Sequence, residues 1–103
     1  MQLKDIQILY NKHKIKWSTH CLARMQERDI SIDDIDNCIK SGEIIEDYPD
    51  DFPYPSCLVF GYTINNKVLH VVVGADKEYV YIITAYFPNT GKFENDFKTR
   101  KEK

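Results

Sequence analysis

The sequence lacks several features that identify common classes of protein. It contains no run of about 18 apolar residues and no apolar N-terminal segment, so we expect neither a membrane-spanning helix nor a signal peptide. It has only four glycines, none of them in a glycine-rich phosphate loop, and it has no serine-nucleophile elbow. A nucleotide-binding P-loop and a serine hydrolase site are therefore not indicated.

Cysteine is also scarce. Cys21, Cys38 and Cys57 make an odd number and form no Cys-x-x-Cys pair, which is typical of reduced thiols in a cytoplasmic protein. The simplest interpretation is that they are small buried apolar residues. Neither the cysteines nor His13, His20 and His70 show the spacing of a known metal site, so we expect no metal and no cofactor.

The formal net charge of −2 conceals a segregation of charge along the chain. Residues 1–28 carry a net charge of +4, residues 29–55 carry −8, and residues 56–103 carry +2. The basic first and last parts could attract phosphate, and the acidic middle could attract a basic partner. The alternative is that each charged run is simply a solvated surface.

The apolar periodicity predicts one α+β domain over residues 1–103. A helical period holds over residues 1–42, with helices at 2–12 and 19–28 and a third between Ser31 and Gly42. An extended piece is expected at 15–17. A period of two then predicts an antiparallel sheet over 43–88, followed by a basic C-terminal tail at 89–103. We expect the helices to pack on one face of a four-stranded antiparallel sheet.

Alternation along the last three predicted strands, 57–64, 67–73 and 79–86, separates a buried face from a second face. The predicted buried face carries Leu58, Phe60, Tyr62, Ile64, Leu69, Val71, Val73, Tyr81, Ile83 and Ala85. The second face carries Gly61, Thr63, His70, Thr84 and Tyr86. Because it has His, Thr and Tyr rather than Lys and Glu, the second face is a candidate functional surface.

The short connections predict how these strands pair. Asn65-Asn66 suits a two-residue turn, which would set Gly61 opposite His70. A three-residue loop at 76–78 would set Thr84 opposite His70, with Tyr86 one diagonal away. We therefore expect His70 to lie beside the Thr84 hydroxyl.

The predicted helix at 19–28 brings together a second set of polar side chains. His20, Arg24, Glu27 and Arg28 fall on one arc because residues three, four and seven apart share a face of a helix. These side chains could form a solvated surface of local ion pairs. The functional alternative places an imidazole that exchanges protons beside a guanidinium that holds a phosphate or carboxylate.

Five ordered motifs resemble the DUF4258 family over roughly residues 18–101. They are His20-x-x-x-Arg24-Met25-x-Glu27-Arg28-x-Ile30-Ser31, Gly42-Glu-Ile-Ile-Glu-Asp-Tyr48-Pro-Asp-Asp51, Pro55-Ser-Cys-Leu58, Leu69-His70-Val-Val72 and Ile83-Thr84-Ala85-Tyr86-x-Pro88. That family in turn resembles the RelE-like and BrnT-like toxins, which are small metal-independent ribonucleases with a RelE/barnase-like fold. Its members are often encoded beside a small antitoxin with a zinc finger and a helix-turn-helix.

The resemblance implies the toxin of a type II toxin–antitoxin pair that cleaves RNA without metal, either free or on the ribosome. His20 or His70 would then carry the proton, Arg24 would clamp the phosphate, and Tyr86 would be a hydrogen-bonding or acid group. Thr84 would orient His70.

Arg28, Lys92 and Arg100 are further expected to bind the RNA substrate. The alternative function is a non-catalytic interaction module that binds a small helix-turn-helix or zinc-finger protein through its acidic middle and open sheet face.

Overall fold

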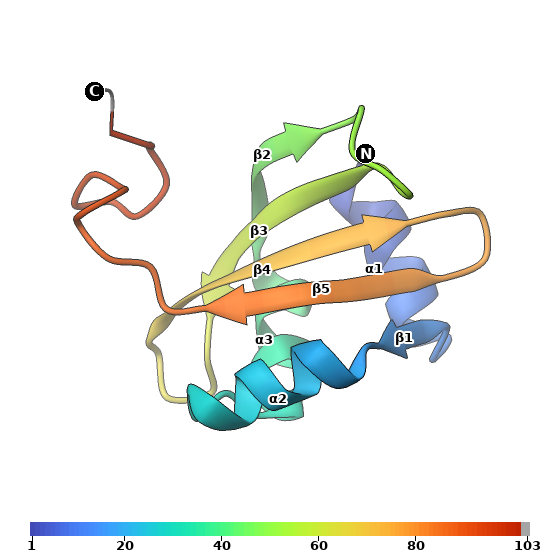
Figure 1. The fold of residues 1–103 in the computed structure, drawn as a ribbon, viewed down its shortest axis with the longest axis horizontal. Coiled ribbons are helices and arrows are strands. Elements are labelled where there is room, and N and C mark those ends of the chain that lie inside the picture. The colour runs from blue at the N-terminus through green and yellow to red at the C-terminus, as the bar shows by residue number, and fades with distance from the viewer. Residues whose placement is uncertain (102–103) are drawn as a thin grey trace.

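A computed structural model describes residues 1–101. The helices and strands follow the chain in the order α1 (Leu3–Asn11), β1 (Ile15–Trp17), α2 (Thr19–Glu27), α3 (Ile32–Ser41), β2 (Glu43–Tyr48), β3 (Ser56–Tyr62), β4 (Val68–Ala75) and β5 (Val80–Tyr86) (Figure 1). The α+β class and the change from helices to strands near Gly42 agree with the sequence prediction. Within residues 1–101, no helix combines the length and apolarity needed to cross a membrane.

Within residues 1–101 the sheet has five strands in the order β1-β5-β4-β3-β2, so the prediction of a four-stranded antiparallel sheet was wrong. The additional strand is β1, which pairs parallel to β5 with Ile15 opposite Val80 and Trp17 opposite Ile82. The other pairs are antiparallel. Three residues are too few for a periodic signal, and their partner lies more than sixty residues further along the chain.

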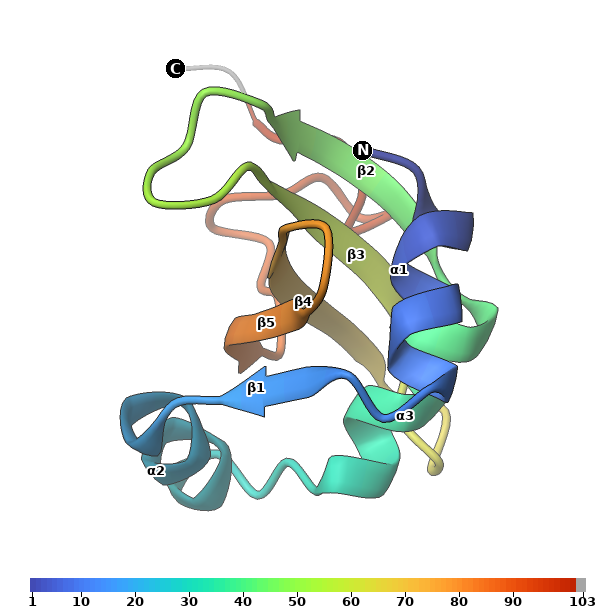
Figure 2. The same ribbon diagram turned by 90° about the vertical axis from the view of Figure 1, so that its right-hand side faces the viewer.

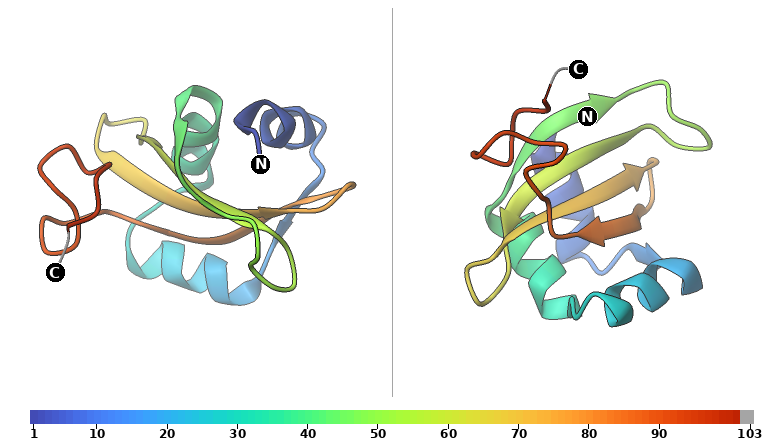
Figure 3. Two further views of the ribbon diagram at one scale, coloured as in Figure 1. Left: turned by 90° about the horizontal axis from the view of Figure 1, so that it is seen from above. Right: turned by 60° about the vertical axis from the view of Figure 1, so that its left-hand side comes forward.

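The helices do not all cover one face, which corrects a second part of the predicted architecture. Figures 2 and 3 show α1 and α3 on one side of the sheet, whereas α2 lies along the β5 edge and projects to the opposite side. The loop at residues 49–55 projects to that same side. We call this side, on which α2 and the loop stand, the open face.

Serine caps determine where two of the helices begin. Ser18 caps α2 by accepting a hydrogen bond from the backbone N–H of Cys21 at 3.0 Å. Ser31 and Asp34 form a reciprocal capping box at the start of α3. Asp34 also accepts a hydrogen bond from the backbone N–H of Ile64 at 3.1 Å, which links α3 to the loop that follows β3.

One buried apolar cluster joins the helices to the sheet. It includes Ile6 from α1, Cys21 and Met25 from α2, and Ile35 and Cys38 from α3. The strand residues of the cluster are Cys57, Val59, Leu69, Val71, Val73, Val80, Ile82 and Ala85. All three cysteines are free and buried, as the simplest interpretation of the sequence expected.

The β3–β4 register differs by one residue from the predicted register. The connection is a three-residue loop closed by a hydrogen bond from the Thr63 N–H to the Lys67 carbonyl, and Asn66 adopts a left-handed conformation with φ 64°. Phe60, not Gly61, therefore lies opposite His70. The shift places Gly61 against α3.

A one-residue shift exchanges the faces of a strand, so the face predicted for β3 was wrong. Leu58 and Phe60 lie on the open face and Val59 points into the core. In β5, Val80 and Ile82 point inward in place of the predicted Tyr81 and Ile83. The face predicted for β4 was correct, because Leu69, Val71 and Val73 are core residues.

The β4–β5 pairing places Tyr86, not Thr84, directly opposite His70. Thr84 lies opposite Val72, one diagonal away, and a bulge follows between Val72 and Val73. His70, Thr84 and Tyr86 nevertheless share the open face, because paired residues and positions two apart on a strand point the same way.

The segment after β5 folds onto the sheet. Phe93 is 2% exposed and forms an isolated bridge with Arg100. The ring of Phe93 packs edge-on against His70 with 4.7 Å between ring centroids. Residues 89–101 therefore cover one end of the open face, and residues 102 and 103 of the predicted tail lie outside the described residues.

Candidate functional site

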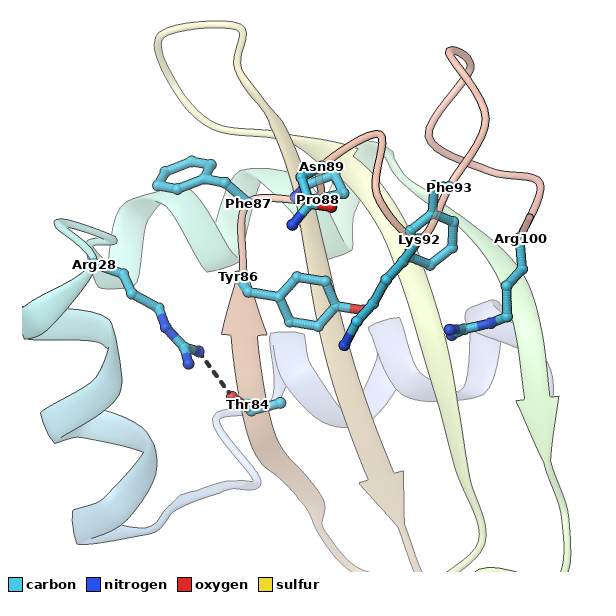
Figure 4. Close-up of a pocket in the computed structure, with 9 residues that line it drawn as sticks. All are labelled: Arg28, Thr84, Tyr86, Phe87, Pro88, Asn89, Lys92, Phe93 and Arg100. Atoms are coloured by element: carbon cyan, nitrogen blue, oxygen red, sulfur yellow. Dashed lines mark hydrogen bonds between the residues drawn. The ribbon is translucent and has the colours of Figure 1, made fainter. Parts of the chain in front are cut away.

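A cavity of about 540 Å³ opens between the end of α2, the second half of β5 and the C-terminal segment. Figure 4 shows the residues that line it: Arg28, Thr84, Tyr86, Phe87, Pro88, Asn89, Lys92, Phe93 and Arg100. Three of them are cationic, and no carboxylate of the described chain lines the cavity. An anion would therefore be attracted to this cavity, although the whole chain is mildly acidic.

The position of Arg28 follows from the incomplete pairing of β5. Strand β1 pairs only with residues 80–82, so the edge of β5 beyond Ile82 has no partner strand among the described residues. Arg28, which caps the C-terminal end of α2, reaches this edge. Its Nη1 donates to the Ala85 carbonyl at 2.8 Å and lies 3.4 Å from Thr84 Oγ1. The guanidinium is thereby held at one side of the cavity.

His70 lies beneath the cavity and is fully buried. Its Nε2 lies 2.6 Å from the Phe97 carbonyl oxygen, and its Nδ1 lies 3.3 Å from the Tyr86 hydroxyl. Because a carbonyl oxygen can only accept, these partners assign the proton of a neutral imidazole to Nε2. Nδ1 then accepts a hydrogen bond from Tyr86.

Burial shifts both members of this pair toward their neutral forms. Desolvation lowers the pKa of His70, against the opposing effects of its bond to Phe97 and of the Glu46 charge. Desolvation also raises the pKa of the Tyr86 hydroxyl. A neutral imidazole thus accepts a hydrogen bond from a phenol that retains its proton, and the phenol connects the buried imidazole to the cavity.

Arg100 forms the opposite side of the cavity and is held by a carboxylate outside it. Its Nε and Nη2 donate to the two carboxylate oxygens of Glu46 at 3.0 and 2.9 Å. The Arg100 guanidinium lowers the pKa of Glu46, and the Tyr48 hydroxyl donates to the same carboxylate. The charge of Arg100 is therefore largely balanced, which leaves Arg28 and Lys92 as the main cations facing the cavity.

Of the eight residues predicted from the sequence, five line this cavity: Arg28, Thr84, Tyr86, Lys92 and Arg100. His70 lies directly behind Tyr86. His20 instead lines a second cavity near the start of α2, and Arg24 pairs with Glu27 at 2.8 Å on the exposed surface of α2. Thr84 contacts Arg28, and His70 is oriented by Tyr86 and Phe97 in place of Thr84.

Phe93, Phe97 and Glu46 were not among the residues predicted from the sequence. The signal for the two phenylalanines was their spacing of four in an otherwise polar tail, which indicates a segment that packs on the sheet. Glu46 carried no signal, since its partner Arg100 is 54 residues away. Residues 1–101 contain no group of three or more His, Cys, Asp or Glu residues arranged to hold a metal ion.

A family model described as "Domain of unknown function (DUF4258)" matches residues 17–87, which is more than half of the chain. The protein therefore belongs to the DUF4258 family. The match includes α2, β5, Arg28, Thr84 and Tyr86, and it ends before Lys92 and Arg100. No curated protein and no solved structure gives a significant match.

Proposed function

We propose that this protein is a metal-independent endoribonuclease, and the toxin of a type II toxin–antitoxin pair, that acts on RNA in the cavity beside β5. The observation that carries the proposal is the Tyr86–His70 hydrogen bond, because Tyr86 lines a cavity to which residues 1–101 contribute three cations and no carboxylate. Cleavage of RNA without metal requires a proton acceptor, a cation near the phosphorus and a proton donor. The cavity contains a candidate for each.

In this mechanism, Tyr86 and His70 act together as the base. The Tyr86 oxygen takes the proton of the RNA 2′-hydroxyl while the Tyr86 proton passes to Nδ1 of His70. The resulting imidazolium keeps its Nε2–H bond to the Phe97 carbonyl. A neutral His70 is the form that can accept this proton, which is consistent with its lowered pKa.

Arg28 and Lys92 complete the reaction. The 2′-oxygen forms a bond to phosphorus, and Arg28 stabilises the charge that develops on the phosphorane. The bond from phosphorus to the 5′-oxygen then breaks as Lys92 donates a proton to that oxygen. The products are a 2′,3′-cyclic phosphate and a free 5′-hydroxyl. The proton on Nδ1 of His70 returns to the Tyr86 oxygen as the Tyr86 hydroxyl releases its own proton, which reaches Lys92 through solvent.

The role of phosphate clamp moves from Arg24 to Arg28 in this proposal, because Arg28 lines the cavity and Arg24 does not. The two residues form a matched pair for a test, since both lie on the exposed side of α2 or at its end. Arg28→Ala should reduce RNA cleavage by at least about 100-fold, as loss of a transition-state contact of roughly 3 kcal/mol would do. Arg24→Ala should leave cleavage within a few-fold of wild type.

Cleavage is measured on total RNA with EDTA present, and the ends of the products are mapped. A 2′,3′-cyclic phosphate and a 5′-hydroxyl are expected, and expression of the wild-type protein should arrest growth until the adjacent antitoxin gene is co-expressed. Intact RNA at high protein concentration, with tight binding of the small helix-turn-helix or zinc-finger partner, would instead support the non-catalytic interaction module.

A further inference from the structure

A second cavity of about 510 Å³ lies on the open face, near the start of α2. Its aromatic lining residues are Trp17, Phe52, Tyr54 and Tyr81, and its polar lining includes Lys16 and His20. They come from β1, α2, β5 and the loop at 49–55. Figure 2 shows α2 and this loop standing on the same side of the sheet with β5 between them.

The aromatic walls of this cavity are both ordered and accessible. Tyr54 and Tyr81 stack with 4.0 Å between ring centroids and 10° between ring planes. The Tyr81 hydroxyl donates to Asp76 at 2.7 Å, which fixes the outer end of the stack. Phe52 is 93% exposed, so this apolar ring gains no stability from the fold around it. A flat apolar ligand would bury it.

The charged side chains that line this cavity are one lysine, Lys16, and one aspartate, Asp51. The Lys16 ammonium group also lies 4.4 Å from the centroid of the Tyr79 ring, which is not part of the cavity lining. Aromatic surfaces beside Lys or Arg are the usual means of binding single-stranded nucleic acid, because bases stack on the rings and phosphates contact the cations.

The two cavities follow one another along β5. Tyr81 and Ile83 line the second cavity, and Thr84 and Tyr86 line the first. The helix α2 follows the same course, with His20 at the second cavity and Arg28 at the first. One extended strand of nucleic acid could therefore occupy both cavities.

We propose that the second cavity is a nucleobase subsite, which stacks an unpaired base of the RNA strand whose phosphate lies between Arg28 and Lys92. The inference rests on the proposed function and extends it: the substrate is single-stranded, and a base next to the cleaved phosphate contributes to binding. Duplex RNA does not fit, since its bases are stacked on each other and cannot enter an aromatic cavity.

Trp17 is the single tryptophan of the chain, so its fluorescence reports on this cavity directly. The probe is a 2′-O-methyl oligonucleotide of eight adenosines, which cannot be cleaved because its attacking hydroxyls are blocked. The comparison is an abasic oligonucleotide with the same number of phosphates. The adenosine oligonucleotide should quench Trp17 and bind roughly 5-fold or more tightly than the abasic one.

Variants separate the base subsite from the phosphate site. Phe52→Ala should abolish the preference for the adenosine oligonucleotide, and His20→Ala should reduce it, without weakening the abasic one. Arg28→Ala should weaken both. Ile8→Ala, which removes an exposed apolar side chain on α1, is the control and should change neither. Phe52, His20 and Ile8 are exposed, so these variants should fold.

The outcomes distinguish the two proposals. Equal affinity for the two oligonucleotides with no quenching, while Arg28→Ala still weakens both, would overturn the nucleobase subsite and leave the ribonuclease proposal standing. Absence of binding by either oligonucleotide would overturn both proposals.

Discussion

At the scale of single residues, Tyr86 and His70 form the strongest candidate for a catalytic pair. Buried polar groups are normally hydrogen-bonded, and both ring nitrogens of His70 have a partner. A purely structural histidine would satisfy the same rule with any two partners. Here one partner, Tyr86, is also part of a cavity wall, so a change in the protonation of His70 reaches the cavity.

Tyr86→Phe tests whether this connection is used. Loss of the hydroxyl leaves Nδ1 of His70 without its partner, and we expect the free energy of unfolding to fall by about 1–2 kcal/mol. RNA cleavage should fall about 100-fold or more, because the proton path from the 2′-hydroxyl to His70 is broken. The 2′-O-methyl oligonucleotide should bind as it does to the wild type, since both phosphate-binding cations remain.

The control for this variant is Tyr62→Phe, which removes a hydroxyl from another strand, outside the cavity. Its RNA cleavage should match that of the wild type. Equal cleavage by Tyr86→Phe and wild type would show that the hydroxyl takes no part in proton transfer.

At the scale of elements, the close packing of α3 on β3 depends on Gly61. A Cβ atom at this position would lie 2.7 Å from Cys38 Sγ, 2.8 Å from the Cys38 carbonyl oxygen and 2.9 Å from its Cα. Two of these atoms are backbone, so the helix itself would have to move. This approach brings α3 against the side of the sheet that faces away from the candidate site.

We therefore expect Gly61→Ala to lower the free energy of unfolding by about 1–3 kcal/mol, as overpacking does elsewhere. Gly74→Ala is the matched control, because Gly74 is also in a strand and its nearest neighbour would be the flexible end of Ile83 at 3.3 Å. Gly74→Ala should cost less than about 1 kcal/mol. Chemical denaturation measures both, and equal costs would show that α3 can shift freely.

The elements also show how far the sequence could predict this structure. The start of α3 followed from Ser31, and the end from Gly42, because caps and stops are local signals. The β3–β4 register could not be predicted from local signals, since Asn66 in a left-handed conformation suits both a two-residue and a three-residue loop. Because the loop is one residue longer than predicted, Phe60 lies opposite His70 in place of Gly61.

The candidate site was predictable where it depended on strand alternation. Thr84 and Tyr86 share the face of His70 in spite of the wrong register. The register error in this part of β5 is two residues, and a shift by two residues leaves each side chain on the same face of the sheet. The sequence placed Arg28 on the correct helix and on the same face as Arg24. Helical spacing shows which side chains share a face, but it does not show which other element a side chain reaches. The contact of Arg28 with the free edge of β5 depends on where β1 stops pairing, which is a tertiary property.

At the scale of the whole molecule, the distribution of charge bears on how RNA could bind to an acidic protein. The chain has a net charge of −2 and a pI of about 5.9. Acidic residues are concentrated between residues 29 and 55, and two of the C-terminal cations are paired with them: Lys98 with Glu43 and Arg100 with Glu46. The positive surface that remains for RNA is therefore small and local, unlike a broad basic face.

This predicts a weak dependence of RNA binding on salt. Each phosphate contact with a single strand contributes a slope of about −0.7 to a plot of log Kobs against log salt concentration. With Arg28 and Lys92 as the main uncompensated cations of the cavity, we expect a slope of roughly −1.4, reduced to about −0.7 in Arg28→Ala. Titrations of the 2′-O-methyl oligonucleotide at several salt concentrations measure it, with Lys4→Ala, on α1, as the control. A slope steeper than about −3 would require a more extensive basic interface than this cavity, and a slope near zero would mean that phosphate is not bound there.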